Sequence, residues 1–216
     1  MASIIIAGDT SGAITLASPA VAGSNTLTLP SSTDTLVGKA TTDTLTNKSI
    51  VATQLTGTIV AARLPTGSTA QIVTSTSGTL ATGTTIIPFD NTIPQNTEGD
   101  QYLSLAITPQ NASSTLEINV VLIVSGTAWS SAGGIVALFQ DATANALAAV
   151  ADGLTNNLAH SISFTHFMAA GTTSATTFKV RAGCGGAGTT TVNGQSGAQL
   201  MGGLSASRIT IKEYLP

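Results

Sequence analysis

The stretch LEINVVLIV, residues 116–124, decides the fold class of this chain. Apolar and polar residues alternate from Leu116 to Val120, and an unbroken apolar run follows to Val124. Alternation with a period of two is typical of a strand with one buried face, whereas a continuous apolar run is typical of a strand buried on both faces. We therefore expect a strand here, with one face buried at its start and both faces buried later.

Similar short runs lie on either side of this stretch. The expected strands are 102–107, 135–139, 161–168, 177–181 and 208–212. In the last run, Ile209 and Ile211 are expected to point inward, and Arg208 and Lys212 outward. Gly, Asn and Pro separate the runs, a spacing typical of an antiparallel β-sandwich or jelly roll. The Ala-rich segment 142–151 lacks helix caps, which favours a turn and a strand over a short helix.

The composition supports a mainly β chain and excludes several classes of protein. Only 8 % of the 216 residues are charged, against about 25 % in an average soluble protein, whereas Thr occurs 37 times and Gly 22 times. Binding to nucleic acid needs clustered Lys and Arg, and a disordered tail usually combines low hydrophobicity with high net charge. We therefore expect a β-rich chain with an uncharged polar surface and no nucleic-acid partner.

The sequence also bears on the compartment of the protein. Its longest strongly apolar run, 120–124, is far shorter than the roughly 20 residues that span a bilayer, so we expect no membrane insertion. The segment Met1–Ala7 has no basic region typical of a signal peptide. Cys184 is the only cysteine, which excludes an intrachain disulfide and fits assembly in a reducing compartment.

Residues 1–83 differ from the rest because they contain no aromatic residue. Within them, 32–40 aligns without a gap with 41–49, so that Thr, Asp, Thr, Leu and Lys recur with a period of nine. Single leucines among Thr, Ser and Gly cannot offset the entropy of ordering one copy of this segment. The segment is either a flexible linker or a stalk intertwined with identical chains, and its regular apolar spacing favours the stalk.

Candidate catalytic groups are few. Asp90, Glu98 and Asp100 lie in one segment, and such carboxylates serve in polysaccharide hydrolysis or calcium binding. Acids in a turn more often accept hydrogen bonds from the local backbone, and we favour that interpretation. Hydrolysis remains an alternative that the spacing alone does not support.

No other motif predicts chemistry. His160 and His166 would share one face of a strand, but no third ligand lies nearby in the sequence, whereas zinc needs three or four. Residues 183–188 match G-x-G-x-x-G formally, yet a Thr-rich strand follows where a dinucleotide site needs a helix, so we expect a glycine hairpin. Cys184 has no basic neighbour closer than Arg181, which disfavours a nucleophile. We expect no catalytic residue, no metal and no cofactor.

Several segments together resemble bacteriophage tail-fibre and virion appendage proteins. In the first half they are 19–30, 42–50, 55–59 and 62–65; in the second half they are 87–95 with 98–99, 137–141, 178–183 and 205–211. The resemblance covers nearly the whole chain, and the order of the segments is more specific than any one of them. It implies a homotrimeric virion structural protein with a C-terminal jelly-roll knob, although large tail fibres are usually much longer than this chain.

The resulting hypothesis divides the chain into three parts. Residues 1–30 form an N-terminal attachment segment to other virion proteins, 31–83 an extended stalk or arm, and 84–216 the jelly-roll-like domain. The expected function is a non-enzymatic fibre or appendage of a virion assembled in the host cytoplasm, with capsid decoration as the alternative. Trp129 is the one candidate contact to a host receptor, such as a cell-surface glycan, if it is exposed; a buried Trp129 would belong to the core.

Overall fold

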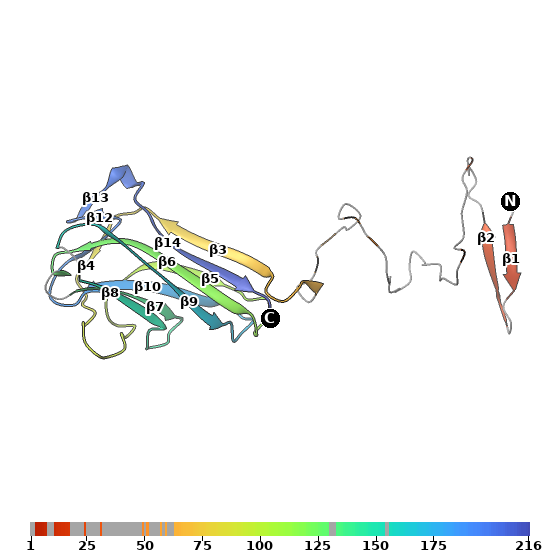
Figure 1. Cartoon of the computed structure of the whole chain (residues 1–216), viewed down its shortest axis with the longest axis horizontal. Coiled ribbons are helices and arrows are strands. Elements are labelled where there is room, and N and C mark those ends of the chain that lie inside the picture. Colours follow the sequence, from red (N-terminus) through yellow and green to blue (C-terminus); the bar gives the residue numbers. More distant parts are fainter. Residues whose placement is uncertain are drawn as a thin grey trace. The chain divides into compact units, whose positions relative to one another are not determined.

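A computed structural model describes residues 3–7, 11–17, 63–129, 133–153 and 156–216, together with the single positions 24, 31, 49, 51, 57 and 59. The chain divides into two units, Met1–Thr56 and Gly57–Pro216. Figure 1 shows the strands of both units. The period-nine repeat of 32–49 and most of the fibre-like segments within 19–62 fall outside the described residues.

The described residues of the first unit include an antiparallel hairpin. β1 (Ser3–Ala7) pairs with β2 (Ala13–Ala17), so that Ile5 lies opposite Thr15. Ile5 and Ile6 are neighbours in one strand and therefore point to opposite faces, and both are more than half exposed. The hairpin thus presents apolar side chains on both of its faces.

The described residues of the second unit form two antiparallel sheets, a short hairpin and a 3-10 helix (Figure 1). The larger sheet has the order β3-β14-β6-β11-β4, and β9 also pairs with β6. The smaller sheet has the order β5-β10-β7-β8, and β12 pairs with β13 in a separate hairpin. The strands of the larger sheet are β3 (Thr69–Ser77), β4 (Ala81–Gly83), β6 (Thr115–Gly126), β9 (His160–Ala169), β11 (Thr190–Val192) and β14 (Ser207–Tyr214). The remaining elements are β5 (Asp100–Ile107), β7 (Gly134–Gln140), β8 (Ala148–Asp152), β10 (Thr176–Cys184), β12 (Gly194–Gln195), β13 (Ala198–Gln199) and a 3-10 helix (Met201–Gly203).

The main core lies between these two sheets and confirms the expected β-sandwich. Its members come from both: Leu116, Ile118, Val120, Leu122, Ile209 and Ile211 of the larger sheet, and Leu103, Val136, Leu138, Phe178 and Val180 of the smaller. Ile209 and Ile211 point inward, as expected. Arg208 and Lys212 alternate with them on the outer face.

The expectation for β6 was right in its first half and wrong in part of its second. Alternate residues from Leu116 to Val124 are fully buried, but Val121 and Ile123 are only half-buried. These two side chains belong to the outer face of the larger sheet, so the apolar run does not mark a strand buried on both faces. Only the end of β6, 124–126, is buried throughout.

The sequence-based boundary near residue 83 lies too far along the chain. β3 pairs with β14 along nearly its whole length, and β4 pairs with β11, so both strands belong to the larger sheet. β3 has few large apolar residues because it lies at an edge: Val73 and Ser75 face inward beside Ile211 and Ile209, which already fill the core. Low hydrophobicity therefore concealed a strand of the second unit.

Candidate functional site

Segment 84–99 lies against the outer face of the smaller sheet and borders a surface pocket. Ile87 is fully buried there and packs in a second apolar cluster with Ile135, Ala137 and Phe139 of β7. The backbone N–H of Ile87 donates to the carbonyl of Cys184 at 3.1 Å. The segment is therefore fixed to the sheet near its start by both packing and hydrogen bonding.

A glycine in β10 permits this close approach. A Cβ atom at Gly183 would lie 2.6 Å from the carbonyl oxygen of Thr85 and 2.9 Å from the backbone nitrogen of Ile87. Both atoms belong to the backbone and cannot move aside cheaply. Gly183 is thus required by the crossing of segment 84–99, and the G-x-G-x-x-G match has a packing explanation at its first position.

The C-terminal end of the segment is also anchored. Arg181 of β10 donates from Nε to the carbonyl of Glu98 at 2.7 Å and from its terminal nitrogen Nη2 to the carbonyl of Gly99 at 2.6 Å. The N–H of Asn96 donates to the carbonyl of Ala144, and the N–H of Ala146 donates to the carbonyl of Pro94. Segment 84–99 and the turn before β8 therefore form one hydrogen-bonded cover.

The three candidate acids all help to shape this cover. Asp90 accepts hydrogen bonds from the hydroxyl and the N–H of Thr92, and these bonds hold the pKa of the Asp90 carboxyl below its ordinary value. Glu98 accepts from the N–H of Gln95 at 2.9 Å. Asp100 accepts from both the N–H and the hydroxyl of Thr85. Asp90 and Glu98 thus have the local, turn-forming contacts that the sequence favoured, whereas Asp100 joins the start of β5 to Thr85, fifteen residues earlier.

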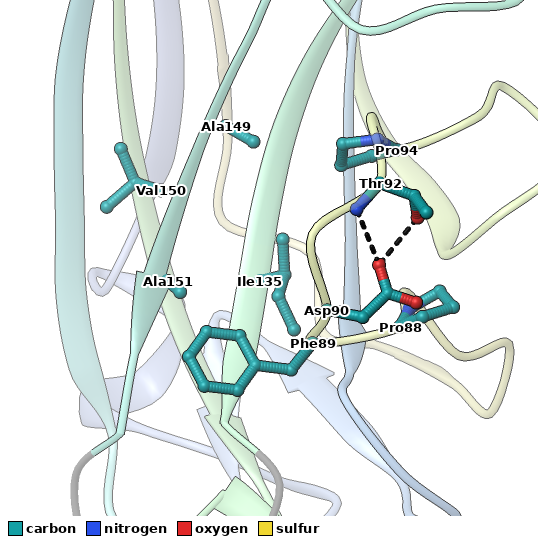
Figure 2. Close-up of a pocket in the computed structure, with 9 residues that line it drawn as sticks. All are labelled: Pro88, Phe89, Asp90, Thr92, Pro94, Ile135, Ala149, Val150 and Ala151. Atoms are coloured by element: carbon teal, nitrogen blue, oxygen red, sulfur yellow. Dashed lines mark hydrogen bonds between the residues drawn. The ribbon is translucent and has the colours of Figure 1, made fainter.

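A pocket of about 150 Å³ lies beside Asp90. Figure 2 shows its lining, which comes from the 88–94 part of the cover and from two strands of the smaller sheet. The lining residues are Pro88, Phe89, Asp90, Thr92, Pro94, Ile135, Ala149, Val150 and Ala151. The walls are mainly apolar, and Asp90 supplies the only carboxylate of this lining, so the pocket lacks the carboxylate pair that glycoside hydrolysis uses.

Trp129 lies in the interior of the unit. Its side chain is fully buried, and its ring stacks on that of His160 with centroids 6.0 Å apart. A Cβ atom at Gly126 or at Gly134 would overlap the indole, so the ring fills a slot between the end of β6 and the start of β7. The buried alternative for Trp129 is therefore the one that the structure shows, and its faces are not available to stack on a sugar.

The two histidines lie in the same strand. His160 and His166 both belong to β9, and no group of three or more His, Cys, Asp or Glu able to hold a metal ion is found among the described residues. Cys184 is buried, and its sulfur lies 3.5 Å from the hydroxyl of Thr190. Neither feature forms a site by itself.

The glycine-rich loop 185–188 differs in one respect from the expectation. A strand, β11, follows it, as the Thr-rich sequence indicated. The loop is not a hairpin, however, because β10 belongs to the smaller sheet and β11 to the larger one. The chain crosses between the sheets here, and Gly188 faces Ala128 and Cys184 too closely for a Cβ atom.

Two polar arrangements escaped the sequence analysis. Glu213 is fully buried and accepts hydrogen bonds from the side chain of Gln71 and from the backbone N–H groups of Gln110 and Asn111. On the outer face of the same sheet, Glu117 accepts from Tyr214 and Lys212, which lowers the pKa of Glu117. The alternation in 208–212 predicted that Lys212 points outward. No sequence pattern predicted that its partner is Glu117, about a hundred residues earlier in the chain.

Comparisons with known proteins identify no relative by sequence. No protein-family model matches the chain, and no curated protein matches it. Among solved structures, latent PorU from Porphyromonas gingivalis matches with 9 % identity and a TM-score of 0.33, over 70 % of this chain and 14 % of that one. The VP2 subviral particle of infectious bursal disease virus matches with 13 % identity and a TM-score of 0.30, over 69 % of this chain and 39 % of that one. This chain therefore spans less than half of either protein, and likeness at this level carries no argument about function.

Among the residues that the structure describes, there is no helix with the length and hydropathy of a membrane span.

Proposed function

We propose that this protein is a non-enzymatic structural protein of a bacteriophage virion. It forms a homotrimeric fibre or appendage, attached through its N-terminal segment, with a jelly-roll-like C-terminal domain directed outward. The resemblance of its ordered sequence segments to phage fibre proteins supports this proposal. The β-sandwich of the second unit is compatible with such a domain.

The observation that carries the proposal is the β1–β2 hairpin. A two-stranded hairpin is at best marginally stable by itself in water. This hairpin exposes Ile5 on one face and Ile6 on the other, so it needs apolar cover on both sides. Insertion between subunits of a larger particle supplies such cover, which suits an attachment segment.

The contacts of the acids favour a structural role as well. Asp90, Glu98 and Asp100 each accept hydrogen bonds that hold segment 84–99 in shape. The hydrolase alternative therefore gains no support from their arrangement. Substitution of Glu98 and Asp100 together by Ala would have to abolish glycan cleavage by a still-folded protein for hydrolysis to be retained.

Immunogold electron microscopy of intact phage particles tests the proposal. The antibody is raised against the second unit, and label confined to the tail is expected. Label spread over the head at high copy number would instead indicate capsid decoration, in which the N-terminal segment lies along neighbouring capsid subunits. Absence of label from every particle would overturn the assignment to a virion.

A double substitution in the hairpin tests the attachment role separately. Replacing Ile5 and Ile6 by Ser should remove the label from particles while leaving the second unit folded, because the hairpin is a separate unit. The matched control is Ile93→Ser, which removes a similarly exposed isoleucine from the second unit. Particles that retain the label after the hairpin substitution would show that attachment uses another part of the chain.

A further inference from the structure

Two edge strands of the larger sheet are unusually open to pairing. In the local order β3-β14-β6-β9, β3 and β9 each pair with a single neighbour among the described strands. They are nine and ten residues long, and neither contains Lys, Arg, Asp, Glu or Pro. Natural proteins usually block long edge strands with charges, proline or bulges, because exposed backbone groups pair with other chains.

The smaller sheet shows the usual protection, which makes the contrast informative. Its edge strand β8 has only five residues and ends at Asp152. Its other edge strand, β5, begins at Asp100, and its pairing with β10 shifts register at Val180 and Arg181. The open edges are therefore a property of the larger sheet alone within the described part of the second unit.

The register of the larger sheet places an apolar side chain at each open edge in the same row. Ile72 of β3 lies opposite Lys212, Lys212 lies opposite Glu117, and Glu117 lies opposite Phe167 of β9. Ile72 and Phe167 are each 60 % exposed. The row thus begins and ends on a large apolar residue, with the Lys212–Glu117 ion pair at its centre.

Strand direction determines how two such sheets can join. Four successive antiparallel strands make β3 and β9 run in opposite directions. When a second copy is related by rotation about an axis along the strands, its β3 therefore runs antiparallel to the β9 of the first copy. The junction continues the alternation of the sheet, and no like charges within the two strands oppose it.

We infer that β9 of one copy pairs with β3 of the next, with Phe167 beside Ile72, and that three copies close into a ring. The inference rests on the homotrimer of the proposed function and names the surface that forms it. Head-to-tail contacts of this kind give a ring when the rotation closes. Pairing of β9 with β9 about a two-fold axis is the competing arrangement, but it would leave Ile72 uncovered.

Cysteine cross-linking of the full chain tests the junction. Side chains directly opposite each other on paired antiparallel strands have Cβ atoms about 4.5–5.5 Å apart, close to what a disulfide needs. The variant carrying both Ile72→Cys and Phe167→Cys should give a covalent trimer after mild oxidation, seen by non-reducing electrophoresis. Each single variant should stay monomeric there, since Cys184 is buried. A covalent dimer of Phe167→Cys alone would establish the two-fold arrangement and overturn the inference.

Sedimentation equilibrium separates this inference from the proposed function. The unaltered chain should sediment at three times 21.4 kDa. Phe167→Lys should weaken assembly at least tenfold, whereas Ile93→Lys, at a site 56 % exposed on segment 84–99, should not. A trimer that survives Phe167→Lys and Ile72→Lys, with no cross-link, would overturn the junction and leave the homotrimer intact. A monomeric unaltered chain would overturn both the homotrimer and the junction, whereas the virion label tests location independently.

Discussion

At the residue scale, the slot around Trp129 shows how a small residue and a large one determine each other. Gly126 and Gly134 leave room for the indole, and His160 lies against its face. The sequence showed a Trp near Ser and Gly, a context that fits an exposed loop as well as a core. Only the placement of β6 and β7 in different sheets of one sandwich brings Gly126 and Gly134 together around the indole.

Gly134→Ala should destabilise the second unit by about 2–3 kcal/mol, the cost of overpacking a core. The new Cβ atom would overlap the indole of Trp129, which is fully buried and has no room to shift. Urea unfolding measures the change in free energy. Gly153→Ala is the control, because a Cβ atom there meets nothing within 4 Å; equal stability of the two variants would contradict the slot.

We expect the second unit to lose stability in alkali because the hydroxyl of Tyr102 is buried. Burial, and then the charges of Asp100 and Cys184, raise the pKa of Tyr102 above its ordinary value of 10.0, and its hydroxyl has no partner among the described residues. Above pH 10 the unfolded chain ionises first, so stability is full below pH 10 and declines as the pH rises further. Tyr102→Phe should make this decline shallower and cost nothing at pH 7.

Chemical unfolding at pH 7 and at pH 11 measures both effects of the Tyr102 substitution. Tyr214→Phe is a useful comparison, because Tyr214 donates to Glu117 and its substitution removes a hydrogen bond at neutral pH. A Tyr102→Phe variant that is as sensitive to alkali as the unaltered protein would contradict the role of burial.

At the element scale, regular strands were predictable and the cover of the smaller sheet was not. Alternation identified β9, β10 and β14 because each has one face toward the core and one toward solvent. Segment 84–99 has no regular period, since its position depends on contacts with β10 that are distant in sequence. The contacts of Asp90 and Glu98 could be predicted because they are local. The pocket beside Asp90 could not be predicted, because strands distant in sequence supply part of its lining.

Arg181→Met should loosen segment 84–99 without unfolding the sandwich. The substitution removes both hydrogen bonds to the carbonyls of Glu98 and Gly99, while the aliphatic part of the side chain is retained. Hydrogen exchange at the N–H of Gly99, which donates to Ile86, should accelerate about tenfold, equivalent to about 1.4 kcal/mol. Lys179→Met is the control on the same strand, because Lys179 donates to the carbonyl of Asp141. Equal exchange in both variants would contradict the anchoring role of Arg181.

At the scale of the whole molecule, the boundary between units matters most. Composition placed it near residue 83, since the first aromatic residue is Phe89. Pairing places it earlier, because β3 and β4 complete the larger sheet. An edge strand contributes backbone hydrogen bonds more than apolar area, so composition is a poor guide to where such a domain starts.

A fragment of residues 57–216 should therefore unfold with nearly the free energy of the same unit in the full chain, whereas a fragment of residues 84–216 should not. The shorter fragment loses β3, β4 and the hydrogen bond from Gln71 to the buried Glu213. We expect it to be less stable by more than about 3 kcal/mol, as for loss of a partner to a buried charge. Thermal melts followed by circular dichroism test this, and equal melting temperatures would restore the boundary near residue 83.

The buried indole has a practical consequence for the study of this protein. The chain has one Trp, and it lies in the second unit against His160. Its fluorescence emission is therefore a built-in reporter of the sandwich, blue-shifted while the slot is closed and red-shifted once water enters. The same signal is silent about the N-terminal hairpin, which contains no chromophore. Emission spectra thus observe one unit of the molecule selectively, without a label.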